Sequence, residues 1–277
     1  MANQPALAAR RLIDAISRRR IYRDAFEIGL VAIAFLLYFL VRGSVIDRQE
    51  AALANALDII ELERTLGFFW ESQMQEWVLG RDALVQLFDG IYFWLDFPLI
   101  VAVGLWLYFS GHRHSYTVAR DAVLASGAIA LVVYFLYPVM PPRLLPPEAG
   151  FTFVDTLTEY NSLSYQAQSA GAFVNPYAAV PSLHYGWQLL VGGVLFWTTK
   201  NPALRVLAVL MPVAQFAAII FTANHYILDA MAGLLVALLG LLAAIALQRA
   251  AYPAVRRALD RWLPEMPALE HASTLEG

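Results

Sequence analysis

The chain has 277 residues, of which 60% are hydrophobic and 15% charged, and a formal net charge of −3. Soluble globular proteins have about 45–50% apolar and about 25% charged residues, so the composition excludes an ordinary soluble domain and indicates a membrane protein. The absence of cysteine excludes disulfides, thiolate nucleophiles and cysteine-bound zinc. The small net charge, with no basic stripe, gives no sign of nucleic-acid binding.

Six apolar stretches are candidates for membrane-spanning helices, each of which needs about 20 largely apolar residues. They cover residues 26–41, 84–109, 121–137, 181–198, 203–222 and 226–247. The sequence therefore predicts an all-α fold, a polytopic membrane helix bundle with six transmembrane helices. We expect residues 1–25 to be a basic N-terminal segment, 26–248 the membrane domain and 249–277 a tail. The first stretch lacks a small-residue cleavage site after it, so we expect it to be retained.

The placement of positive charge predicts the orientation. Most of the 19 Lys and Arg residues fall before the first span, after the last span or in the loops on that same side. The other side holds Arg42, Arg48, Arg64, Arg81 and Arg143. The positive-inside rule then predicts that both termini are cytoplasmic, with the plasma (inner) membrane as the expected location.

Two loops on the outer side are long. Residues 43–83 carry apolar side chains at helical spacing between charged ones, a pattern that predicts interfacial amphipathic helices. Residues 138–180 are rich in Pro, Gly, Ser and Asn. A loop of that length in a compact protein is often functional.

Two of the five histidines stand at the outer ends of predicted spans. They are His184 and His225, and because both of their helices run inward, the two imidazoles are expected at a similar depth. Asp229 follows His225 by four residues and so shares its helix face. A hydrogen bond between them would fix the imidazole tautomer and favour its charged form. The remaining histidines are His112, His114 and His271, which we expect to be solvated.

Four further polar residues each have two readings. Arg143, in MPPRLLP, is either a bidentate phosphate ligand or a contact to lipid headgroups. Ser182 is either an N-cap alone or part of a phosphate cradle at a helix N-terminus. Asp89 and Asp96 share one face of the second predicted span. They are either functional ionisable groups or a sign that the span starts later.

The segments NPYAAVPSLH (175–184) and NHYILD (224–229) resemble the type 2 phosphatidic acid phosphatase (PAP2) superfamily. They are most similar to its branch of inositol phosphorylceramide synthases. The resemblance covers most of residues 26–247 and implies that His225 forms a phosphohistidine, Asp229 orients it and His184 protonates the leaving oxygen. It further implies that Ser182 and Arg143 bind the phosphate, and that no metal or cofactor takes part.

Three positions depart from the phosphatase pattern of that superfamily. Leu136 stands where a lysine is usual, Ile219 where an arginine is usual, and Leu183 where a glycine is usual. The resemblance therefore implies a phosphate site that is poor in cations. This departure favours the transferase-like branch over plain phosphatidate hydrolysis.

The sequence thus predicts an integral membrane lipid phosphotransferase or phosphatase. Its substrate would be a phospholipid or lipid phosphate, and the acceptor would be water or a lipid hydroxyl. The alternatives are a metal-dependent hydrolase with His184, His225 and Asp229 as ligands, and a serine hydrolase on Ser182, which lacks an elbow motif. A non-enzymatic lipid transporter or scramblase is the remaining alternative.

Overall fold

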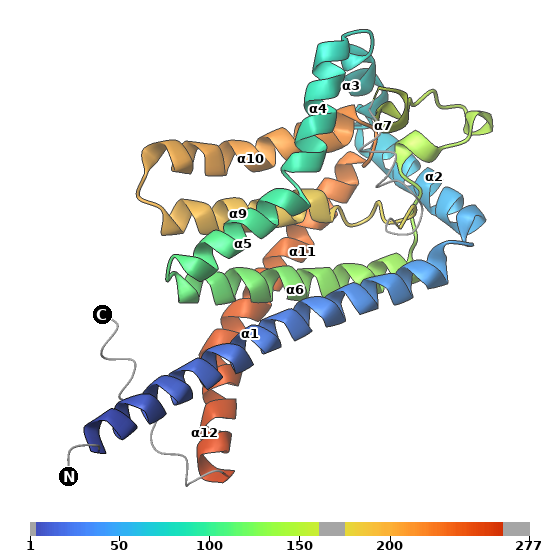
Figure 1. Ribbon diagram of the computed structural model, residues 1–277. Helices are drawn as coiled ribbons and strands as arrows, with labels where there is room; N and C mark the ends of the chain where they lie inside the picture. The colour runs from blue at the N-terminus through green and yellow to red at the C-terminus, as the bar shows by residue number, and fades with distance from the viewer. Residues whose placement is uncertain (1–3, 161–174, 263–277) are drawn as a thin grey trace.

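The computed structural model describes residues 4–160 and 175–262, and all regular elements within these ranges are helical. In chain order they are α1 (Gln4–Val45), α2 (Gln49–Leu66), α3 (Glu71–Val78), α4 (Asp82–Trp94), α5 (Phe97–Phe109), α6 (Arg113–Leu136), the 3₁₀ turns η1 (Pro142–Leu144) and η2 (Pro147–Ala149), α7 (Thr156–Glu159), α9 (Leu183–Thr198), α10 (Pro202–Phe221), α11 (Ile227–Ala246), the π-helical η3 (Leu247–Ala251) and α12 (Tyr252–Trp262) (Figure 1). The all-α prediction is confirmed for these residues.

Four described helices are long and apolar enough to cross a membrane. They are Asp24–Val41, Arg113–Leu136, Pro202–Phe221 and Ile227–Val255. Helices α4 and α5 make a fifth span if they count as one, although they are bent by 43°. The predicted count of six is not confirmed, because α9 has only 16 residues. At a rise of 1.5 Å per residue, that length is shorter than a hydrocarbon core of about 30 Å.

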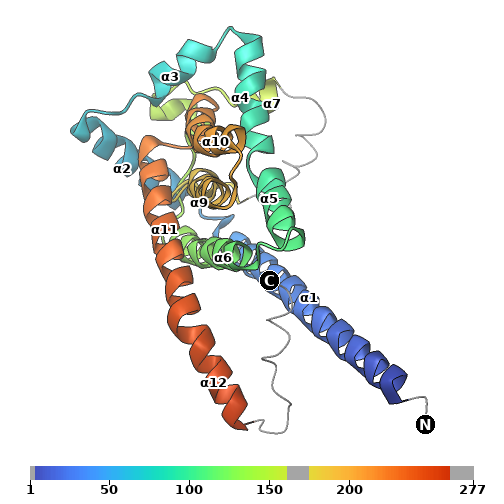
Figure 2. The same ribbon diagram turned by 90° about the vertical axis from the view of Figure 1, so that its left-hand side faces the viewer.

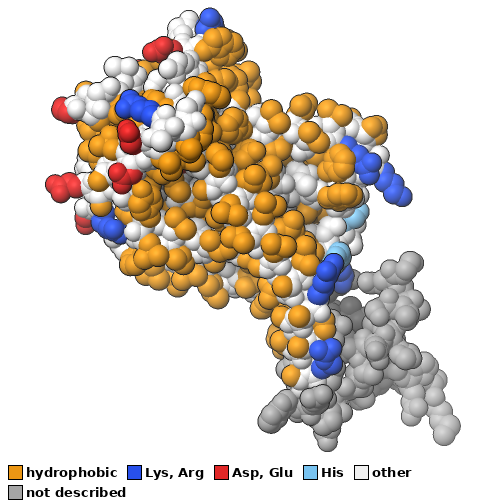
Figure 3. Space-filling model, turned by 180° about the vertical axis from the view of Figure 1, so that it is seen from behind, with side chains coloured by type: hydrophobic (Ala, Val, Ile, Leu, Met, Phe, Trp, Pro, Cys, Tyr) orange, Lys and Arg blue, Asp and Glu red, His pale blue; other side chains and the backbone are white. Residues whose placement is uncertain are grey.

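The outside of the bundle is apolar, as contact with lipid requires. Figure 3 shows hydrophobic side chains spread over the middle of one face, while charged side chains gather towards its ends. Leu207, Leu210 and Leu242 are among the exposed residues of α10 and α11. Soluble monomers rarely expose apolar surface of this extent.

Helix α11 packs closely against α9 and α6 through glycine. A Cβ atom added to Gly233 would lie 2.3 Å from the carbonyl oxygen of Ser182, and one added to Gly240 would lie 2.5 Å from that of Ala122. Small residues let membrane helices approach this closely. The contact at Gly233 places the N-terminal turn of α11 beside that of α9.

The helices on either side of α9 reach it from different directions. Figure 2 looks nearly along α6, α9 and α10, with α11 on one side and the α4–α5 pair on the other.

The expected helices in residues 43–83 form as α2 and α3, which lie near the ends of α10 and α11. Their position at a membrane interface stays a prediction.

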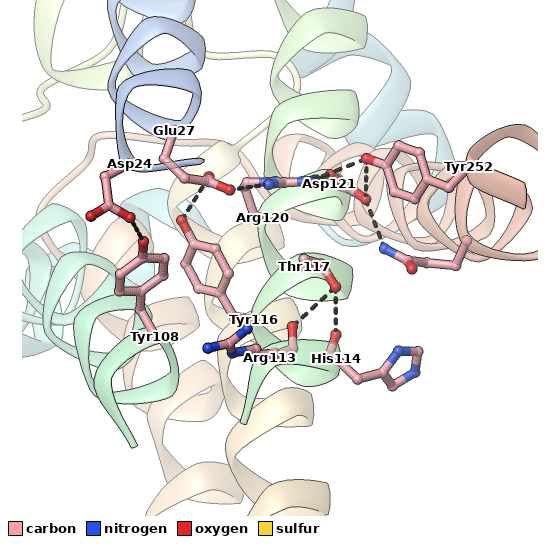
Figure 4. A network of polar contacts seen from close by, with 11 residues as sticks. Asp24, Glu27, Tyr108, Arg113, His114, Tyr116, Thr117, Arg120, Asp121 and Tyr252 are labelled. Carbon is pink, nitrogen blue, oxygen red and sulfur yellow. Dashed lines mark hydrogen bonds and ion pairs between the residues drawn. The ribbon is translucent and has the colours of Figure 1, made fainter. Parts of the chain in front are cut away.

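A polar network joins α1, α6 and α12 at the end of the bundle where α6 begins (Figure 4). Arg120 of α6 forms ion pairs with Glu27 of α1 and with Asp121, the latter at 2.7 Å. Tyr252 of α12 donates a hydrogen bond of 2.9 Å to Asp121. Ionisable groups near a membrane interior are costly unless paired, so these contacts stabilise the attachment of both terminal helices.

Candidate active site

His184 and His225 lie together, although forty residues separate them in the chain. His184 is in the first turn of α9 and His225 is in the turn before α11. Their ring centroids are 5.5 Å apart in an edge-to-face arrangement. The side chain of His184 is 26% exposed and that of His225 is 6% exposed. The ring of His184 is thus partly exposed to solvent, whereas that of His225 is nearly buried.

The Nδ1 atom of His225 has two acceptors. It lies 2.8 Å from the carbonyl oxygen of Ala179 and 3.1 Å from Oδ2 of Asp229. A carbonyl oxygen can only accept, so Nδ1 carries the hydrogen. In the neutral ring, Nε2 then holds a lone pair and is the nucleophilic atom. The predicted His225–Asp229 contact is present, and the Ala179 carbonyl adds a partner that the sequence did not indicate.

The buried position of His225 affects its protonation. Burial lowers the pKa of His225 well below its ordinary value, and the nearby His184 and Arg143 lower it further, against the opposing hydrogen bond to Ala179. This lowered pKa favours a neutral imidazole, because loss of hydration disfavours the charged form. The expectation that Asp229 favours the charged imidazole stays a prediction.

The first turn of α11 is held by three carboxyl groups. The backbone N–H of Tyr226 donates to Asp229 (2.8 Å), that of Ile227 to Glu71 (2.8 Å) and that of Leu228 to Glu63 (2.7 Å). All three carboxyl side chains have no exposed surface. The amides that begin a helix lack partners within it, and here each is satisfied.

Sequence reasoning missed Glu63 and Glu71. The buried face of α2 consists of Ala52, Ala56, Ile60 and Glu63. Glu63 thus continues an apolar stripe at helical spacing. A charged residue in register with such a stripe is the signal that could have found it. Glu71 is the first residue of the short α3, where no comparable stripe precedes it.

His184 contacts two residues near the break between α4 and α5. Its Nε2 atom is 2.9 Å from the hydroxyl of Tyr92, and the two rings are 4.4 Å apart. Its Nδ1 atom is 3.1 Å from Oδ2 of Asp96, which is ion-pair distance without the alignment of a hydrogen bond. The bend between the two helices places Tyr92 and Asp96 beside His184.

The two aspartates of this span share a helix face by spacing, but they have different contacts in the structure. Asp96 adjoins His184, whereas Asp89 accepts a hydrogen bond of 2.7 Å from Thr156 of α7. Asp89 is 2% exposed. It therefore anchors the loop segment to α4, and of the two only Asp96 belongs to the site.

Arg143 is docked on the turn that carries His225. Its Nε atom donates to Asn224 (2.8 Å), its backbone N–H donates to Ala223 (2.9 Å), and one terminal nitrogen pairs with Asp155 at 3.0 Å. The guanidinium has five N–H groups, so these two side-chain bonds leave donors for an oxyanion. The loop residue predicted as a phosphate ligand is thus brought to the site.

Ser182 is the N-cap of α9, as one of its two readings proposed. Its Oγ atom accepts a long hydrogen bond of 3.4 Å from the backbone N–H of Tyr185, and the residue has no exposed surface. Its own N–H donates to the carbonyl of Asp229 (2.9 Å). Ser182 therefore joins the two helix starts, and its phosphate-binding role stays a prediction.

Within residues 4–160 and 175–262, no three His, Asp or Glu side chains are arranged to hold a metal ion. His225 and Asp229 contact each other through Nδ1 and Oδ2, which are 3.1 Å apart.

The fold and this site define an integral membrane protein with a paired-histidine centre at one end of a helical bundle. The family model of the PAP2 superfamily matches residues 57–243. The chain belongs to that superfamily, and its matched region includes both histidines, Asp229, Ser182 and Arg143.

A curated relative is named phosphoinositol dihydroceramide synthase, from Bacteroides thetaiotaomicron. It is 25% identical to this chain over 168 residues, which are 57% of the chain and 55% of the relative. The chain thus matches just over half of the relative's length. No solved structure matches it.

Proposed function

We propose that this protein transfers a phosphoryl group to or from a membrane lipid through a phosphohistidine on His225. The observation that carries the proposal is the pair of acceptors beside Nδ1 of that residue, from which its tautomer follows. Ala179 and Asp229 hold Nδ1–H, so the lone pair of Nε2 is available for attack. No metal is needed in this mechanism.

The reaction proceeds in two displacements. Nε2 of His225 attacks phosphorus, the bond from phosphorus to the leaving oxygen breaks, and protonated His184 gives its proton to that oxygen. Neutral His184 then takes the proton of an acceptor hydroxyl, whose oxygen attacks the phosphohistidine and frees His225. Covalent catalysis divides one difficult step into two easier ones, and the proton transfers contribute about 10²–10⁴ in rate.

Arg143 is the cation that the described site residues supply to the phosphate, together with the N-terminus of α9. Ile219, where an arginine is usual in the superfamily, is fully buried, and its carbonyl accepts the N–H groups of Asn224 and His225. A site poor in cations suits a phosphodiester, which carries less charge than a monoester. We therefore propose a lipid phosphodiester as donor and a lipid hydroxyl as acceptor, in line with the relative's name.

We also propose that residues 26–248 form the catalytic membrane domain and that both termini are cytoplasmic. The start of α1 and the whole of α12 lie away from α2, α3 and α7 (Figure 1). The histidine end of the bundle, where α9 and α11 begin, is the end nearer to those three helices. The positive-inside distribution then supports a site on the extracytoplasmic side of the plasma membrane.

The test is turnover by purified protein in lipid vesicles, with phospholipids, isoprenoid phosphates and sphingolipid acceptors, in the presence of EDTA. We expect an acid-labile phosphoryl-enzyme, inhibition by vanadate, and loss of turnover in His225→Ala. Turnover that EDTA abolishes would support a metal enzyme instead. Movement of lipid between leaflets without bond cleavage would support the transporter alternative.

A further inference from the structure

Glu63 and Glu71 form a buried carboxyl pair beneath the first turn of α11. In each, Oε1 accepts one backbone N–H of that turn. In each, Oε2 is buried and has no donor within hydrogen-bond distance. The two carboxyl groups accept from consecutive amides, those of Ile227 and Leu228, so they are neighbours. An ionised carboxylate only accepts hydrogen bonds, so a proton on one of the pair would supply the donor that both Oε2 atoms lack.

The described groups that face this pair are acidic and not basic. From α11 it is faced by Asp229 and Tyr226, and Asp229 adds a third acidic group. The neighbouring cation on α2, Arg64, lies over the rings of Phe69 and Phe151, 5.1 Å from each centroid. Among the described residues, the ion pairs involve neither glutamate. Two negative charges buried together without a cation would be strongly unfavourable.

We propose that Glu63 and Glu71 share one proton and act as positioning residues for His225, by holding the turn of α11 that begins beside it. The shared proton gives each Oε2 the partner that it otherwise lacks. The outer helices α2 and α3 are thereby tied to the helix that carries Asp229. The positioning role rests on the proposed function, whereas the shared proton can be tested without it.

The shared proton makes stability depend on pH. Burial, together with the neighbouring Glu71, raises the pKa of Glu63 from 4.5 to about 9. The unfolded chain releases this proton above about pH 4.5, whereas the folded chain keeps it up to about pH 9. The contribution to stability is therefore complete below pH 4.5 and is lost as pH rises towards 9.

The test compares wild type with Glu63→Gln in detergent, using the midpoint of thermal unfolding (Tm) between pH 6 and pH 9. A glutamine is neutral, keeps the acceptor for Leu228 and can donate to Glu71, so it imitates the protonated pair. We expect Tm to fall with pH more steeply in wild type than in Glu63→Gln. The control is Glu61→Gln, an exposed residue of the same helix, which should follow wild type. Glu71→Gln, tested as a second variant, should flatten the curve as Glu63→Gln does.

Equal slopes of Tm against pH in wild type and both glutamine variants would contradict the proposal that the two glutamates share a proton. Failure of both variants to fold at pH 6 would do the same, because it would show that two carboxylates are required.

The positioning role is tested by kinetics at pH 7. Glu63→Ala is expected to lower kcat by about 10²-fold with little change in KM, the size of effect produced by a displacement of about 1 Å. Unchanged kcat in folded Glu63→Ala would overturn that role. If wild type turns over no substrate, the Tm comparison still tests whether Glu63 and Glu71 share a proton.

Discussion

The carbonyl oxygen of Ala179 lies 2.8 Å from Nδ1 of His225. Ala179 belongs to the segment that leads into Ser182 and His184, so the backbone of one motif orients the reactive ring of the other. Asp229 shares this task from its own helix, at 3.1 Å. The imidazole of His225 is therefore fixed by two acceptors from separate parts of the chain, and loss of one leaves the other in place.

Asp229→Asn is expected to lower kcat by about 10²-fold. This loss is smaller than the loss of about 10⁴ found where an aspartate alone sets the tautomer of a catalytic histidine. The backbone carbonyl of Ala179 still selects Nδ1–H in the variant. The measurement is single-turnover formation of the phosphoryl-enzyme. A loss as large as that of His225→Ala would contradict the role given to Ala179.

Asp96→Asn is expected to lower kcat about 10-fold, within the range of general acid–base effects, because it removes the charge beside His184. Asp89→Asn should leave kcat within about 2-fold of wild type, since an asparagine oxygen can still accept from Thr156. Initial rates in vesicles compare the two variants. The matched control is Asp82→Asn, an exposed residue of α4. Equal losses of kcat in Asp89→Asn and Asp96→Asn would contradict the role given to Asp96 beside His184.

Gly233→Ala is expected to destabilise the protein by about 1–3 kcal/mol, the usual cost of overpacking, and to lower kcat as well. Its new methyl group would lie 2.3 Å from the carbonyl oxygen of Ser182, which is backbone and cannot turn aside. Helix α9 would have to move, and His184 with it. Thermal unfolding and kcat are measured together. Gly193→Ala is the control, because a Cβ there meets nothing within 4 Å, and it should leave both values near wild type.

Arg143→Lys is expected to raise KM about 10-fold while kcat changes less. Lysine keeps the charge but lacks the planar fork that binds Asn224, Asp155 and an oxyanion together. Steady-state kinetics with a phospholipid substrate test this expectation. The control is Arg81→Lys, an exposed position at the start of α4. An unchanged KM would show that Arg143 only stabilises the turn before His225.

Sequence reasoning located the features that depend on local spacing. The apolar stretches identified a membrane helix bundle, because a span requires a continuous run of apolar residues. The spacing of four residues placed Asp229 against His225, because residues i and i+4 share a helix face. The two motif histidines were expected at one depth, and the structure places their rings in contact.

The tertiary structure decided what depends on contacts between distant segments. Asp89 and Asp96 are equivalent by spacing, and only the bend between α4 and α5 brings Asp96 to His184. Glu63 and Glu71 read as charges on an amphipathic surface, but packing against α11 buries both. Burial changes the protonation of a carboxyl group and the charge of an imidazole, since both depend on lost hydration. Residue spacing reports which side chains share a face, whereas the protonation of the site follows from what the fold removes from solvent.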